Sequence, residues 1–279
     1  MIHEISPHQF NNRYVSYPKT GNDDYIFHFS GNSLLLKECD GDFELPRKRD
    51  FPDVSEFAEF YFLFTLDDVP CFLVRDNLQE LHSECIMKDI HFFRSTGKKE
   101  LAWAMLAGFH LMNWYLQNKY CGVCGAENRH NPTERALVCP SCKATVYPKI
   151  SPAIIVAIIG KDKILLARNV NFPGKWYSLV AGYADIGESL EDAVVREVKE
   201  EVGLDVWNIR YYKSQPWPLS GSMMIGFVAE ADDAQPVVID NKEITEAAWF
   251  TRDNLPDHPS KLSIAGEMIE KFRTGELQV

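Results

Sequence analysis

The feature that most constrains the fold of this chain is a set of four cysteines arranged as two close pairs. Cys121 and Cys124 form one pair, Cys139 and Cys142 form the other, and fourteen residues separate the pairs. In each pair a tight turn directs two thiolates at one point, and a tetrahedral zinc ion accepts four thiolates at about 2.3 Å. Two disulfides or a redox-active pair are the alternatives. Four thiolates leave no open coordination position, so we expect a structural zinc that stabilises a segment too short for its own core.

The length and the net charge of the chain indicate how many domains it has and which kinds of binding partner are disfavoured. The chain has 279 residues, 46% hydrophobic and 25% charged, which excludes wholesale disorder and favours two domains with a small third element. Its net charge of −11 argues against nonspecific binding of nucleic acid or of an anionic membrane. A polyanionic substrate therefore needs a local site that brings its own cations.

The compartment is predicted from the apolar runs and the remaining cysteines. No run is long enough to cross a bilayer, and the first residues do not resemble a secretory signal, so we expect a cytoplasmic protein with no membrane partner. In that compartment Cys39, Cys71 and Cys85 are expected to be reduced core residues.

The predicted elements separate an N-terminal region from a C-terminal one. The first third of the chain has short apolar and aromatic runs typical of strands, with a turn in residues 67–70, and no catalytic constellation. Residues 98–118 have the apolar periodicity of a helix. A buried strand over 153–159 then opens a hairpin, and further strands alternate with helices over 189–202 and near 261–272. This alternation predicts a mixed sheet sandwiched by helices.

The helix over 189–202 carries the strongest chemical signal. Glu197 and Glu201 share one helical face, and Glu200 lies beside them near the C-terminal end, where the helix dipole is unfavourable to carboxylates. A solvated acidic helix is the plain interpretation. Divalent cations, Mg²⁺ or Mn²⁺, would make the crowding tolerable and would also hold substrate phosphates. Glu188 at the helix start is placed to pair with Arg196 or with a backbone amide.

A longer ordered string contains these glutamates. From Gly182 to Leu204 the sequence reads Gly-x5-Glu-x7-Arg-Glu-Val-x-Glu-Glu-x-Gly-Leu, which resembles the Nudix box at every defined position. The resemblance implies an enzyme that hydrolyses nucleoside diphosphates linked to another moiety. It also implies that Glu197 and Glu201 bind Mg²⁺ or Mn²⁺, that Glu200 is a further ligand or the catalytic base, and that the Ala181 carbonyl is another ligand.

A second signature follows the box. Residues 214–222 read Ser-Gln-Pro-Trp-Pro-Leu-Ser-Gly-Ser, and we expect the prolines to hold a rigid segment outside any strand ladder. A proline-stiffened edge loop without a binding role is the plain alternative. With the cysteine pairs, this segment resembles the NADH pyrophosphatase subfamily of Nudix hydrolases, except that Leu219 and Ser220 replace Phe and Pro. The resemblance implies a substrate-binding set: Gln215, Pro216, Trp217, Pro218, Leu219, Ser220, Gly221 and Ser222.

The same resemblance assigns residues outside the two signatures. Tyr147 and Tyr183 would be aromatic residues that sandwich a base, although Phe is usual where Tyr183 stands. Glu243 would be the last metal carboxylate, with Glu246 as a competing candidate. Ala265 would contact the substrate through its backbone.

The resemblance also implies an overall organisation. We expect an α/β protein with an N-terminal α/β Nudix-like domain over residues 1–117 and a zinc ribbon over 118–148. A catalytic Nudix α/β/α sandwich with a mixed sheet would occupy 149–279. The family is dimeric with a shared site, so we expect a homodimer with one structural zinc per subunit.

The activity that the resemblance implies is hydrolysis of the pyrophosphate bond of NAD(H) to NMN(H) and AMP. Members of the family also remove NAD caps from RNA 5′ ends, and recognition of the cap alone would not need a large RNA-binding surface. One alternative is a Nudix hydrolase of ADP-ribose or dinucleoside polyphosphates, which the box alone permits and the 214–222 segment disfavours. Another is a zinc-ribbon nucleic-acid-binding regulator with an inactive Nudix domain. That alternative predicts lost box carboxylates, whereas here they are intact.

Overall fold

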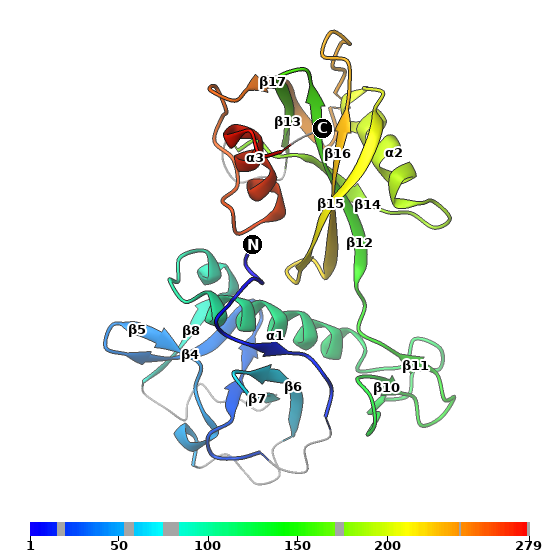
Figure 1. The fold of residues 1–279 in the computed structure, drawn as a ribbon. Coiled ribbons are helices and arrows are strands. Elements are labelled where there is room, and N and C mark those ends of the chain that lie inside the picture. The colour runs from blue at the N-terminus through cyan, green and yellow to red at the C-terminus, as the bar shows by residue number, and fades with distance from the viewer. Residues whose placement is uncertain (16–19, 53–58, 75–83, 171–175, 240, 278–279) are drawn as a thin grey trace. The chain divides into compact units, whose positions relative to one another are not determined.

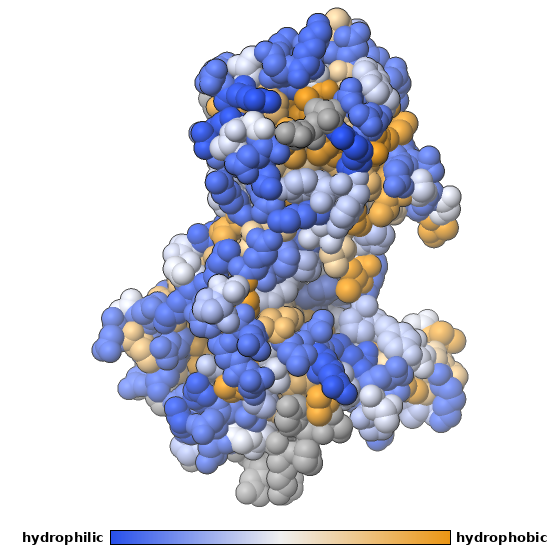
Figure 2. Space-filling model, viewed as in Figure 1, coloured by the Kyte–Doolittle hydropathy of each residue, from blue (hydrophilic) through white to orange (hydrophobic). Residues whose placement is uncertain are grey.

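The computed structural model describes residues 1–15, 20–52, 59–74, 84–170, 176–239 and 241–277. The chain divides into two compact units (Figure 1). One comprises Met1–Ile2, Ile150–Trp217 and Gly221–Val279, and the other comprises His3–Lys149 and Pro218–Ser220. Among the described residues, no helix combines the length and apolarity needed to span a membrane. Hydrophilic residues cover most of the face shown in Figure 2.

The C-terminal unit is built on a six-stranded mixed sheet of order β15-β16-β12-β13-β17, with β14 also paired to β12. Strand β12 runs parallel to β16 and antiparallel to β13 and β14. The elements of this unit are β12 (Ser151–Gly160), β13 (Lys163–Asn169), β14 (Val180–Tyr183), α2 (Leu190–Val202), β15 (Trp207–Trp217), β16 (Ser222–Glu230), β17 (Ile244–Thr251) and α3 (Ile264–Thr274).

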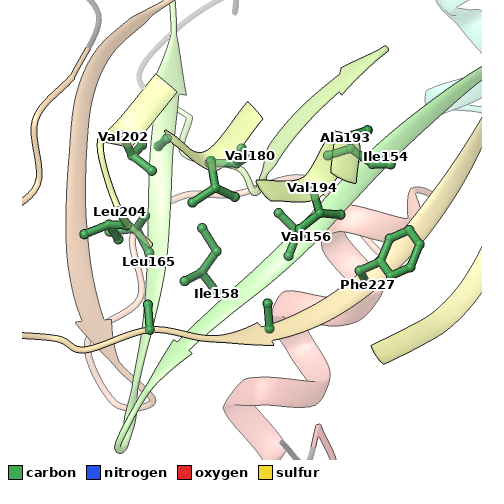
Figure 3. Packing of buried hydrophobic residues seen from close by; sticks show 14 of the residues in the cluster. Ile154, Val156, Ile158, Leu165, Val180, Ala193, Val194, Val202, Leu204 and Phe227 are labelled. Atoms are coloured by element: carbon green, nitrogen blue, oxygen red, sulfur yellow. The ribbon is translucent and has the colours of Figure 1, made fainter. Parts of the chain in front are cut away.

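Strand β12 fills two cores at once because its side chains alternate between the faces of the sheet. Ile154, Val156 and Ile158 pack into a cluster with the valines of α2 (Figure 3). Ile155, Ala157 and Ile159 belong to a second cluster that contains Met268 and Ile269 of α3. A strand covered on both faces has no polar alternation, which is why 153–159 is continuously apolar. The predicted mixed sheet between helices is confirmed.

The N-terminal unit contains two small sheets and one long helix. Strand order is β1-β6-β7-β2 in the first sheet and β3-β4-β5 in the second, where β8 also pairs with β4. The bounds are β1 (Phe10–Asn11), β2 (Tyr25–Phe27), β3 (Phe29–Ser30), β4 (Ser33–Cys39), β5 (Asp42–Glu44), β6 (Phe60–Leu66), β7 (Val69–Val74) and β8 (Cys85–Asp89), with 3₁₀ turns at Lys48–Asp50 and Ile90–Arg94 and helix α1 at Lys99–Gln117.

Two details of the N-terminal unit differ from prediction. The turn expected over 67–70 is confined to Asp67 and Asp68, both at positive φ, because Val69 and Pro70 already pair with β6. Of the three cysteines expected in the core, only Cys71 is buried, and Cys39 and Cys85 are half-buried. The ribbon segment follows α1 with three short strands, β9 (Arg129–His130), β10 (Leu137–Val138) and β11 (Thr145–Val146), in the order β11-β10-β9.

Candidate active site

The glutamate helix α2 is fixed at both ends by its own sequence. The Ser189 hydroxyl accepts a hydrogen bond from the Asp192 N–H at 3.1 Å, and the Asp192 carboxylate accepts one from the Ser189 N–H at 3.3 Å. Gly203 ends the helix at a φ of 73°, a conformation that glycine adopts without steric cost. The apolar stripe of this helix is fully buried against the sheet: Val194, Val198 and Val202. The caps and the stripe together set which face carries the glutamates.

The three glutamates of α2 lie at different depths. Glu201 is only 5% exposed, and the Glu197 side chain is 14% exposed, whereas the Glu200 side chain is 61% exposed. A buried carboxylate is costly unless positive charge or hydrogen bonds compensate it. Glu197 and Glu201 therefore require compensation inside the structure, while Glu200 is the member of the set that reaches solvent.

Arg196 is the centre of the carboxylate cluster. From the sequence, only a pairing between Arg196 and Glu188 was predicted. Its guanidinium donates to both oxygens of Glu188 at 2.6 and 3.0 Å, a bidentate pair. It also donates to Glu197 at 2.8 Å and to Glu200 at 3.3 Å. A further bond reaches the Tyr183 carbonyl at 3.0 Å and ties α2 to strand β14. In the sequence, these contacts could have been inferred from the spacing, because Glu197 follows Arg196 directly and Glu200 lies four residues after it.

The electrostatics of the cluster leave negative charge in excess. Arg196 and the Asp185 N–H lower the pKa of Glu188 to about 2. Burial raises the pKa of Glu197 above its ordinary value, and repulsion from Glu200 and Glu243 adds to the rise while Arg196 opposes it. One guanidinium thus faces several carboxylates that disfavour one another's ionised forms. A divalent cation among them would remove that penalty.

Gly182 makes room for the Glu197 carboxylate. A Cβ atom at Gly182 would lie 2.0 Å from the Glu197 carboxyl carbon, far inside contact distance. Gly182 is in β14 opposite Ile154 of β12, and its neighbour Ala181 pairs with Ile155. The first glycine of the box is therefore needed for close approach between helix and strand, and it brings Glu197 beside the strand that carries the Ala181 carbonyl.

The structure separates the two candidates for the last carboxylate. Glu243 is exposed, and its charge contributes to the raised pKa of Glu197, so the two side chains share one electrostatic neighbourhood. Glu246 instead accepts a hydrogen bond from Tyr177 and pairs with Arg168 at 3.4 Å. These contacts favour Glu243 over Glu246 as the carboxylate of the cluster.

The glutamates do not converge as closely as the cysteines do. In the described part of the chain, only Cys121, Cys124, Cys139 and Cys142 bring three or more ligand atoms within 4.8 Å of one another. Arg196 holds Glu197 and Glu200 in its own hydrogen bonds. The metal roles of Ala181, Glu197, Glu200, Glu201 and Glu243 therefore stay predictions.

The 214–222 segment is not outside the strand ladder, and that expectation was wrong. Gln215, Pro216 and Trp217 are the last residues of β15 and pair with Met224, Met223 and Ser222 of β16. Strand β15 is at the edge of the sheet, where a proline without an N–H can face away from the ladder. The turn itself comprises Pro218, Leu219, Ser220 and Gly221, with Gly221 at a φ of 65°.

The Gln215 amide forms hydrogen bonds within the protein on both of its polar atoms. The side chain is fully buried, its amide nitrogen donates to the Leu262 carbonyl at 2.9 Å, and its amide oxygen accepts from the Ile264 N–H at 2.6 Å. It therefore clamps the start of α3, next to Ala265, and its predicted contact with substrate stays a prediction. The Ser263 hydroxyl caps the same helix through the Gly266 N–H at 3.2 Å.

The aromatic residue of the box is tied to the second signature. Tyr183 is 53% exposed, and its hydroxyl lies 3.1 Å from the hydroxyl of the buried Ser222. Ser222 thus orients the Tyr183 ring, a link that a phenylalanine would not make. Tyr147, the other predicted aromatic residue, is 57% exposed and belongs to the N-terminal unit.

The four cysteines form a site that fits zinc. Sγ of Cys121 lies 3.5 Å from Sγ of Cys142, and Sγ of Cys124 lies 3.4 Å from Sγ of Cys139. These separations far exceed the disulfide bond length of about 2.05 Å and approach the sulfur spacing of a tetrahedral four-thiolate zinc site. All four cysteines are free in the structure, which favours the zinc site over the disulfide alternative.

The two cysteine turns have matching backbone geometry. The Gly125 N–H donates to the Cys121 carbonyl at 2.9 Å, and the Lys143 N–H donates to the Cys139 carbonyl at 3.0 Å. Backbone N–H groups also point at the Cys121 and Cys139 sulfurs at 3.4 Å, and they lower the pKa of both thiols, that of Cys139 to about 6. Stabilised thiolates are the form that binds zinc.

Comparison with known families matches all three parts of the chain. The profile described as NUDIX domain matches residues 149–272. That of the NADH pyrophosphatase zinc ribbon domain matches residues 117–147. Residues 23–114 match the NADH pyrophosphatase-like rudimentary NUDIX domain.

Individual relatives agree with these matches. A protein of Escherichia coli O1:K1 named NAD-capped RNA hydrolase NudC is 40% identical over 206 residues, which are 72% of this chain and 76% of that protein. Its counterpart from Salmonella heidelberg is 45% identical over 163 residues, but the match spans only 58% of this chain and 63% of the relative. A solved NUDIX hydrolase from Nitrosomonas europaea is 23% identical, with a TM-score of 0.48, covering 57% of this chain and 94% of that one.

Proposed function

This chain belongs to the Nudix family, with the zinc ribbon and rudimentary Nudix domain of the NADH pyrophosphatases, and we propose that it hydrolyses the pyrophosphate bond of NAD(H) to NMN(H) and AMP. The observation that carries this proposal is the intact set of box glutamates on α2, of which Glu197 and Glu200 accept hydrogen bonds from Arg196 and Glu197 packs against Gly182. A regulator with an inactive Nudix domain would not need that set.

We extend the proposal to NAD-capped RNA because relatives at 40–45% identity have the name NAD-capped RNA hydrolase. In both substrates the same bond is broken, with water adding to one phosphorus while the other phosphate leaves. The net charge of −11 favours recognition of the cap over recognition of a long stretch of RNA.

For the catalytic metal we propose Mg²⁺ or Mn²⁺, held by Glu197, Glu201, Glu243 and the Ala181 carbonyl, with Glu200 as a further ligand or base. Burial raises the pKa of Glu197, and the nearby carboxylates of Glu200 and Glu243 add to the rise, which supports this assignment. Bound divalent cations supply neutralisation of the diphosphate and activation of water.

The chain's own residues account for orientation and proton transfer. Glu200 is the exposed member of the set and is placed to take a proton from water. Tyr183 offers an exposed ring for stacking against a base, and Ser222 fixes the direction of that ring. The Ala265 N–H is in the first turn of α3, where backbone donors have no partner within the helix and favour a phosphate.

Two further parts of the proposal concern the protein in the cell. We propose a homodimer in which Tyr147 of one subunit and Tyr183 of the other sandwich a base. We also propose a cytoplasmic location, which the free thiols of Cys39, Cys71 and Cys85 support.

A product assay tests the function. Wild-type protein with Mg²⁺ or Mn²⁺ should convert NADH, NAD⁺ and NAD-capped RNA to products that contain NMN(H) and AMP. Glu201→Gln should lose most of that activity. Faster turnover of ADP-ribose or of dinucleoside polyphosphates than of all three would replace the proposed substrate, and full activity of Glu201→Gln would refute the metal site.

A further inference from the structure

A cavity in the N-terminal unit, remote in sequence from the glutamate helix, is lined by residues with the chemistry to hold a nucleobase. It has a volume of about 630 Å³ and is bounded by β6, the end of α1 and the ribbon. That volume falls within the range of about 300–1,000 Å³ typical of small-molecule sites. No lining residue comes from α2 or from the 214–222 segment. The catalytic site proposed above leaves this cavity unexplained.

One wall of the cavity is aromatic. The rings of Tyr61 and His130 stack with centroids 4.3 Å apart and planes 19° from parallel, and Tyr115 lies 4.9 Å from His130. Tyr61, Tyr115 and His130 also line an adjacent hollow of about 290 Å³, so the aromatic wall borders open space on two sides. A planar base can extend such a stack, and stacking tolerates any base.

The wall is held rigidly because the ribbon is anchored to the N-terminal sheet. His130 is in β9, which pairs with β10 between the two cysteine turns. Arg135 of the ribbon donates to the carbonyls of Asn12 and Leu63, and the Tyr14 hydroxyl donates to the Asn131 carbonyl at 3.3 Å. A preformed ring position reduces the entropy lost on binding.

The polar lining indicates what kind of base fits. The Asn128 side-chain oxygen is buried and, in the described part of the chain, has no hydrogen-bond partner. Glu59 and Glu127 add acceptors, while Lys119 and Arg129 add two positive charges. Acceptors suit exocyclic amino and ring N–H groups. The equal numbers of positive and negative side chains disfavour a polyphosphate and leave room for one phosphate.

We propose that this cavity binds a single purine nucleotide that carries an exocyclic amino group, stacked on the Tyr61–His130 pair. The nucleotide is either free or part of an RNA chain. Binding of a nucleotide within an RNA chain rests on the proposed activity toward NAD-capped RNA. Binding of a free nucleotide does not rest on that activity.

Calorimetric titration of the full-length protein with GMP tests the site. Wild type should show saturable binding, and His130→Ala should weaken it at least about fivefold through the loss of stacking. His130→Tyr keeps a ring and should retain binding. His91→Ala, which removes another exposed histidine of the same unit, should bind as wild type does. Zinc content measured for each variant shows whether the ribbon is intact.

Two results would overturn the proposal. One is the absence of saturable GMP binding. The other is binding that His130→Ala does not weaken and that competes with NADH, because such binding belongs to the catalytic site. Hydrolysis of NADH should stay within about twofold of wild type in His130→Ala. A failure of the proposed nucleotide site can therefore be distinguished from a failure of the proposed activity.

Hydrolysis of NAD-capped RNA distinguishes the two sources. If a nucleotide of the RNA chain occupies the cavity, His130→Ala lowers kcat/KM on capped RNA at least about fivefold and leaves kcat/KM on NADH unchanged. If the occupant is a free nucleotide, both substrates are unaffected while GMP binding is still weakened.

Discussion

At the scale of residues, Arg196 and Gly182 allow several carboxylates to lie close together in this site. Arg196 pairs with Glu188, Glu197 and Glu200, and Gly182 leaves space for the Glu197 carboxylate. The box string predicted which residues gather here, because helical spacing puts glutamates four apart on one face. It did not predict that Arg196 bridges them, since a guanidinium has several reachable partners and only the folded geometry selects among them.

Replacing Gly182 with alanine should move Glu197. The added Cβ would overlap the carboxylate, so the side chain must shift and metal binding should weaken. We expect kcat/KM for NADH to fall about 10–100-fold, with a higher Mg²⁺ concentration needed for half-maximal rate. Gly97→Ala is the matched control because a Cβ at Gly97 meets nothing within 4 Å. Equal Mg²⁺ dependence of the two variants would contradict the close-approach role.

Glu188 should make stability depend on pH in acid. Its pKa falls from 4.5 to about 2 in the folded protein, so its ionised form stabilises the fold above pH 4.5 and that contribution is lost as pH falls toward 2. Urea unfolding should therefore show Glu188→Gln to be less stable than wild type at neutral pH, with the difference narrowing in acid. Glu191→Gln, at an exposed position on the same helix, should show no such convergence.

At the scale of elements, apolar pattern was a good guide wherever a helix or strand has one clear buried face. Helix α2, strand β12 and the β12–β13 hairpin follow from such patterns. The last residues of β15 did not, because a proline has no N–H to donate to a ladder and only tertiary context shows that this strand is at the edge of the sheet. The clamp by Gln215 was also unpredictable, since its partners are 47 and 49 residues away.

The Gln215 clamp should be required to order the start of α3. Gln215→Met keeps the volume but leaves the buried Ile264 N–H without its partner, which should cost about 1–3 kcal/mol of folding free energy. The Leu262 carbonyl keeps the hydrogen bond that it accepts from the Ile2 N–H at 2.9 Å. We also expect a raised KM and faster hydrogen exchange in the first turn of α3. Gln235→Met is the control, because Gln235 makes two similar bonds to Asp205 at the surface. A change in KM without faster exchange would favour direct contact with substrate.

The ribbon is an element that depends on its metal. Its three strands are two residues each, too short to be stable alone, so zinc binding should supply their folding free energy. Wild-type protein should release one zinc per chain on denaturation, and Cys139→Ser should release little and be cleaved faster by protease within 121–146. Cys39→Ser, at a half-buried cysteine outside the site, should behave as wild type. Full zinc content in Cys139→Ser would contradict the assignment.

For the whole molecule, the order of ribbon, box and second signature was visible in the sequence because each has fixed spacing. The proposed sharing of the site between subunits was not visible, because Tyr147 and Tyr183 are far apart in the sequence and spacing does not indicate which copy of the chain supplies a ring. A net charge of −11 adds a constraint at the same scale, since an anionic substrate must be met by local cations.

Mixing two inactive variants tests whether the site is shared between subunits. Tyr147→Ala and Glu201→Gln should each be impaired as homodimers, because every site lacks either the ring or the glutamate. After exchange of subunits at equal concentrations, half of the dimers should be mixed, and one of the two sites in each mixed dimer combines both native residues. NADH hydrolysis should then recover to about a quarter of the wild-type rate for a symmetric dimer. A mixture no more active than its components would mean that each subunit carries a complete site of its own.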